Sequence, residues 1–162
     1  MRALWLSAAA AVVLEAVVLW LLAPLQPGAL VLQLAWTPRG FGEIIHLWSA
    51  EDLVRYRAHL IVDCALLLAY GSFGWLLATR TRLLAPLPPR VRALAPFLPL
   101  FAAGFDMLEN SLHWWLTAAP RFGMPWLYLT SASAAALKWL LLMLFVALLL
   151  WALAVDRGDG QA

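Results

Sequence analysis

The chain has 162 residues, of which 65% are hydrophobic and 12% are charged, and its mean hydropathy is +0.85. A soluble domain carries charge on about a quarter of its residues and a disordered chain is poor in apolar ones, so both classes are excluded. One cysteine, Cys64, excludes an internal disulfide and a cysteine-based zinc cluster, and a net charge of +2 without any basic run leaves nucleic acid unexpected as a partner.

Four apolar stretches are long enough to cross a bilayer, which takes about 20 residues. They lie at about 3–25, 58–78, 93–117 and 126–155. The first is too long for a signal peptide and contains Glu15, so we interpret it as a retained helix. The sequence therefore predicts a single all-α transmembrane domain over residues 1–162, a four-helix bundle.

The connection between the first two stretches contains two helix-start signals. Thr37-Pro38 places a capping residue before a proline at the first helical position. Ser49 and Asp52 have the spacing of a capping box, which would begin a helix that continues into the second span. We expect a short interfacial amphipathic helix before it, acting either as a connector or as a lid.

Basic residues predict the orientation of the spans. The connection between the second and third spans contains four arginines and no acid: Arg80, Arg82, Arg90 and Arg92. Under the positive-inside rule this connection is cytoplasmic, and so are both termini. The expected location is a cell membrane that the chain crosses several times. Tryptophans near most span ends agree with this arrangement, since indole rings favour the headgroup level.

Five ionisable residues interrupt the apolar spans. They are Glu15, Asp63, Asp106, Glu109 and Lys138. On insertion scales a charge near a helix centre costs about 2.5–3.5 kcal/mol, and such residues normally face the bundle interior and pair with one another. They are therefore the first candidates for function.

Helical spacing and depth predict that these residues meet. Counting 1.5 Å per residue from the outer tryptophans puts the acids of different spans in the same outer half of the membrane. Other polar residues follow them at steps of three, four or seven and so share their helix faces. The expected polar chamber consists of Glu15, His59, Asp63, Tyr70, Asp106, Glu109, Asn110, His113 and Lys138.

The charge in this chamber does not balance. Four carboxyls face one lysine and two histidines. Protons, a cation or a ligand with an amine are expected to neutralise the excess, unless the group only locks the helices together. No metal site or cofactor is expected, because Glu109 and His113 are four residues apart, one more than in the Glu-x-x-His pattern of di-iron bundles.

Two resemblances follow from these residues. The pattern Tyr56-Arg57-x-x-Leu60-x-x-Asp63 with Tyr70, then Asp106-x-x-Glu109-Asn110 and Lys138, resembles a set of small bacterial four-span membrane proteins. That resemblance implies the fold, the site and a location in the inner membrane of a bacterial cell, but no activity. The architecture is also similar to the sterol-isomerase and sigma-2-receptor superfamily, which implies a membrane pocket with carboxylates for an amine-bearing or sterol ligand.

Three functions remain as expectations. The first is a non-enzymatic membrane protein that binds protons or a small amphipathic or cationic ligand in the chamber. The second is a small enzyme that modifies a lipid or sterol, with Glu109 or Asp106 as the catalytic proton donor or acceptor. The third is an accessory subunit of a larger membrane complex. Membrane lipids are expected partners in each case, and a homo- or hetero-oligomer is compatible with all three.

Overall fold

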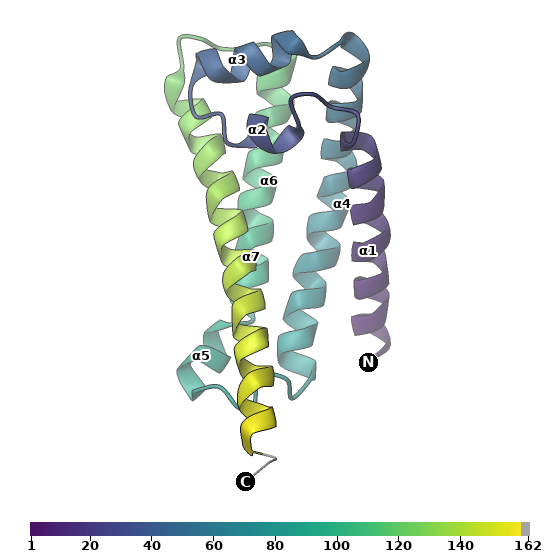
Figure 1. Cartoon of the computed structure of the whole chain (residues 1–162), viewed down its shortest axis with the longest axis vertical. Helices are drawn as coiled ribbons and strands as arrows, with labels where there is room; N and C mark the ends of the chain where they lie inside the picture. Colours follow the sequence, from purple (N-terminus) through teal and green to yellow (C-terminus); the bar gives the residue numbers. More distant parts are fainter. Residues whose placement is uncertain (160–162) are drawn as a thin grey trace.

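The computed structural model describes residues 1–159, which contain seven helices and no strand. Residues 160–162 of the expected domain lie outside this range. The long helices stand side by side (Figure 1): α1 (Arg2–Leu22), α4 (Ala50–Arg80), α6 (Phe97–Ala118) and α7 (Pro125–Asp159). Three short helices lie at the ends of the bundle: α2 (Ala29–Gln33), α3 (Pro38–Leu47) and α5 (Pro89–Leu94). Four segments are long and apolar enough to cross a membrane, with α5 and α6 counted as one. The predicted all-helical, four-span fold is confirmed.

Two span boundaries differ from the sequence prediction, and prolines account for both. α1 ends at Leu22 rather than near residue 25, because Pro24 has no amide hydrogen with which to continue the helix. The third span was expected to begin near residue 93, but α6 begins at Phe97. There the proline is Pro96, which follows α5 and separates it from α6 by a turn.

The two predicted helix starts in the first connection are confirmed. Thr37 Oγ1 accepts a hydrogen bond from the amide of Gly40 at 3.1 Å, at the start of α3. The amide of Asp52 donates to Ser49 Oγ at 3.1 Å, and the amide of Ser49 donates to Asp52 Oδ2 at 3.1 Å, which completes the capping box of α4. Both helices therefore begin at the residues that the sequence predicts.

α3 lies across one end of the bundle (Figure 1) and is amphipathic. Its Phe41 and Ile44 are buried against the bundle, whereas Arg39 and Glu43 are exposed and form an ion pair of 2.7 Å. The first and last residues of the long helices place both chain ends at the opposite end of the bundle (Figure 1).

The four long helices pack in the order α1, α4, α6, α7. α4 and α6 approach each other closely at Gly74, where an added Cβ would lie 2.6 Å from side-chain carbons of Pro99. The connection 119–124 joins α6 to α7, and these two helices pack along their length. Among the residues described, α1 and α7 have no comparable packing against each other, so the bundle is open along one side.

Two apolar clusters close the interior at its ends. The larger one lies beneath α3 and contains Phe41, Trp48, Tyr56 and Tyr128. The smaller one lies at the end with the chain termini and contains Leu84, Leu87, Ala95 and Ala152. The buried charged residues Asp63, Asp106, Glu109 and Lys138 lie between these clusters along their helices.

Candidate functional site

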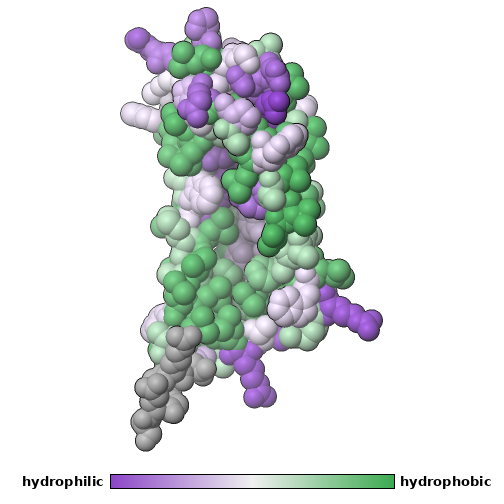
Figure 2. Space-filling view, turned by 45° about the vertical axis from the view of Figure 1, so that its right-hand side comes forward, coloured by the Kyte–Doolittle hydropathy of each residue, from purple (hydrophilic) through white to green (hydrophobic). Residues whose placement is uncertain are grey.

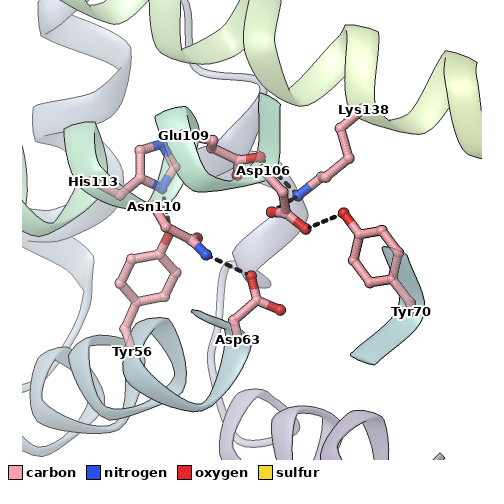
Figure 3. Close-up of polar contacts among 8 residues, drawn as sticks. All are labelled: Tyr56, Asp63, Tyr70, Asp106, Glu109, Asn110, His113 and Lys138. Atoms are coloured by element: carbon pink, nitrogen blue, oxygen red, sulfur yellow. Dashed lines mark hydrogen bonds and ion pairs between the residues drawn. The ribbon is translucent and has the colours of Figure 1, made fainter. Parts of the chain in front are cut away.

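Lys138 on α7 is the centre of a buried group of charged side chains (Figure 3). Its Nζ lies 2.8 Å from Oδ1 of Asp106 and 2.7 Å from Oε2 of Glu109, both on α6. The three residues are 4%, 3% and 0% exposed, respectively. Charges at this burial are stable only when paired, so the lysine neutralises acids that would otherwise oppose folding.

Hydrogen bonds extend this group to α4 (Figure 3). The hydroxyl of Tyr70 donates to Oδ2 of Asp106 at 3.0 Å, so both oxygens of Asp106 have partners. Nδ2 of Asn110 donates to Oδ2 of Asp63 at 2.7 Å. The polar network therefore joins three of the four long helices.

A second set of buried polar contacts lies toward α3. The hydroxyl of Tyr56 is hydrogen-bonded to Nδ1 of His113, and Nδ1 of His59 donates to the backbone carbonyl of Tyr56. The rings of Tyr56 and His59 are 4.5 Å apart. Because a carbonyl can only accept, Nδ1 of His59 carries the hydrogen, and Nε2 of a neutral ring is left as an acceptor.

A cavity of about 830 Å³ lies between α1, α4, α6 and α7, with α2 along its edge. Figure 2 shows hydrophilic residues in a hollow between hydrophobic ones on this side of the molecule. Several apolar lining residues, among them Val12, Leu19 and Trp139, are also exposed on the outside of the bundle. The cavity therefore opens sideways, through the gap between α1 and α7. Six of the expected chamber residues line it: Glu15, His59, Asp63, Tyr70, Asp106 and Lys138.

Two carboxylates in this cavity lack a cationic partner among residues 1–155, the part of the chain whose side chains the structure describes. Glu15 is exposed at the α1 wall and forms no hydrogen bond or ion pair within that range. Asp63 uses only Oδ2, for Asn110, which leaves Oδ1 free. The one lysine is already engaged by Asp106 and Glu109. Together with Nε2 of His59, the cavity offers acceptors and negative charge that its own side chains do not satisfy.

The other three expected chamber residues do not line this cavity. Glu109, Asn110 and His113 are buried in the contacts of α6 with its neighbouring helices, because their face of α6 turns away from the gap between α1 and α7. Within the described range, Oε1 of Glu109, Nε2 of His113 and Oγ of Ser131 are buried without a hydrogen-bond partner. In the same range, no three His, Cys, Asp or Glu residues are placed to hold a metal ion.

Sequence reasoning did not identify two features of the site. Gln33, on α2, lines the cavity. A helix of five residues is too short to show periodicity, and Gly28 at its start was the only local signal. The guanidinium of Arg57 lies 4.1 Å from the ring centre of Trp114, a contact between α4 and α6 that spacing along one helix cannot reveal.

Comparisons of the chain with protein-family models, with curated proteins and with solved structures give no match.

Proposed function

We propose that this multi-pass membrane protein binds a small amphipathic molecule with a cationic amine head in the cavity between α1 and α7. The observation that carries the proposal is the pair of carboxylates, Glu15 and Asp63, that line an otherwise mostly apolar cavity without a cation of their own. Negative charge in such surroundings favours a positively charged guest.

The size and opening of the cavity support a lipid-like ligand. Small-molecule sites typically enclose about 300–1,000 Å³, and this cavity is about 830 Å³. Exposed apolar residues such as Leu19 and Leu30 line its side, where the hydrocarbon tail of a membrane-dissolved molecule would enter. The amine would then donate to Asp63 Oδ1 and to His59 Nε2, which lie one turn apart on the same face of α4.

The ion pairs of Lys138 support a binding role rather than catalysis. Both oxygens of Asp106 already accept hydrogen bonds, and Glu109 lies outside the cavity lining. These acids therefore hold α6 and α7 in place around the site, and the free carboxylates of Glu15 and Asp63 meet the ligand.

The test uses dodecylamine as the probe and dodecanol, with the same tail, as the uncharged control. The melting temperature of the purified protein in detergent is expected to rise with the amine and not with the alcohol. In Asp63→Asn, the amine concentration needed for the same rise in melting temperature is expected to be about 10- to 100-fold higher. This factor corresponds to the loss of one charge-assisted hydrogen bond. The asparagine can still accept from Asn110, so the fold is retained.

Glu15→Gln should also weaken amine binding, and Glu43→Gln is its matched control. Glu43 is an exposed acid on α3, paired with Arg39 and remote from the cavity lining. Equal stabilisation by amine and alcohol, or an unchanged amine effect in both cavity variants, would reject the proposal. Turnover of added lipid that disappears in Glu109→Gln would instead favour the enzyme alternative, and instability without a co-purifying chain would favour the subunit alternative.

We also propose that both termini face the cytoplasm of a bacterial cell and that α3 lies at the outer face of the inner membrane. The support is the cluster of four arginines at the termini end, Arg80, Arg82, Arg90 and Arg92. Alkaline phosphatase fused after α7 should be inactive, whereas the same enzyme inserted in the connection 119–124 should be active. The reverse pattern would overturn this orientation.

A further inference from the structure

A second cavity, of about 440 Å³, lies between α4 and α6. It is separate from the cavity of about 830 Å³ in which we propose that an amine binds. Its α4 residues are Leu60, Ile61 and Cys64, and its α6 residues are Asn110, Ser111 and Trp114. At about 100° per residue, these α4 residues lie on another face of the helix than His59 and Asp63. Ile61 is 63% exposed, so this cavity opens onto the outside of the bundle.

Arg57 lies at the end of this second cavity nearest α3. It precedes Leu60, Ile61 and Cys64 by three, four and seven residues, so it shares their face of α4. Its guanidinium stacks on the ring of Trp114, which lines the cavity. One nitrogen, Nη1, donates to the carbonyl of Trp114 at 3.0 Å and to Thr117 Oγ1 at 3.1 Å. These contacts hold the cation in one position.

The charge of Arg57 is not compensated among the side chains that the structure describes, those of residues 1–155. Arg39 and Arg55, near the same end of the bundle, form ion pairs with Glu43 and Glu51 at 2.7 and 2.8 Å. Arg57 has no carboxylate within ion-pair distance in that range, and its hydrogen bonds there use only Nη1. Its remaining N–H groups are therefore available to an anion.

We propose that a membrane phospholipid occupies this cavity, with its phosphate on Arg57 and an acyl chain along Leu60, Ile61 and Cys64. A guanidinium matches the geometry of a phosphate, and tryptophan favours the headgroup level of a bilayer. The apolar part of the cavity begins one turn from Arg57 and reaches Cys64 two turns away, about 10 Å along the helix. The positive charge of Arg57 and the apolar residues beyond it thus lie in the same order as the phosphate head and the acyl tail of a phospholipid.

Cys64 provides a direct readout, because it is the single cysteine of the chain, is half-buried and lines this cavity. The rate of its alkylation by N-ethylmaleimide is measured on the purified protein in a detergent without phospholipid. Added phosphatidylglycerol is expected to slow the reaction. Inorganic phosphate, which has no tail, and diacylglycerol, which has no phosphate, are expected to give little protection.

Arg57→Gln should raise the phosphatidylglycerol concentration needed for protection about 10-fold or more, the value of one hydrogen bond to a charged group. Arg55→Gln removes the same charge from a residue already paired with Glu51 and should leave protection unchanged. Native mass spectrometry of the unmodified protein should retain phosphatidylglycerol in preference to diacylglycerol, which tests the proposal without any variant. Equal protection by diacylglycerol or by phosphate alone, or full protection in Arg57→Gln, would overturn it.

Discussion

Replacing Lys138 with methionine tests whether the buried charges hold the bundle together. The substitution keeps the length and much of the volume of the side chain but removes the cation that lies within 3 Å of both Asp106 and Glu109. All three side chains are at most 5% exposed, so the ion pairs are buried ones. Breaking a buried ion pair by removing one partner costs about 3–5 kcal/mol, and this is the expected loss in the free energy of unfolding.

The assay is reversible unfolding in mixed micelles of a mild detergent and sodium dodecyl sulfate, followed by circular dichroism. Arg55→Gln is the matched control, since it breaks an ion pair of 2.8 Å that is partly exposed and worth about 0–1 kcal/mol. Adding Asp106→Asn and Glu109→Gln to Lys138→Met should recover much of the loss, because positions 106 and 109 then carry no charge that needs the lysine. The reasoning fails if Lys138→Met costs no more than Arg55→Gln, or if the triple variant is no more stable than the single one.

Two further substitutions test the packing and capping of α4 by thermal unfolding. Gly74→Ala places a Cβ 2.6 Å from carbons of Pro99 and should cost about 1–3 kcal/mol, whereas Gly104→Ala, with no such atom within 4 Å, should not destabilise the protein. An equal response of the two glycines would show that α4 and α6 are not in close contact. Ser49→Ala removes the cap of α4 and should cost about 0.5–2 kcal/mol, with Ser49→Thr retaining most of the stability. A neutral Ser49→Ala would mean that the capping box contributes little.

The fold could be predicted because its signals lie within single helices. Span length and hydropathy define the four long helices, and the caps at Thr37 and Ser49 follow from a few adjacent residues. The break before α6 also has a local cause, since Pro96 separates it from the preceding helix.

The site could be predicted only in part, because it depends on how helices face one another. Helical spacing and depth predicted that Asp106, Glu109 and Lys138 meet, and they are in contact. Helix rotation could not be derived from one sequence, so nothing distinguished Asp63, which lines the cavity, from Glu109, which lies behind it. The side on which the bundle opens depends on α1 and α7 remaining apart, and no residue pattern encodes that separation.

The pairing of Lys138 also determines when during synthesis its charges can meet. α6 leaves the ribosome with both acids before α7 brings the lysine, and only the connection 119–124 separates the two helices. Such a short connection delivers them to the bilayer as one helical hairpin, in which the lysine offsets one of the two acidic charges. A nascent chain that ends before α7 is therefore expected to retain α6 poorly in the membrane, and a glycosylation-site reporter placed after α6 would measure this.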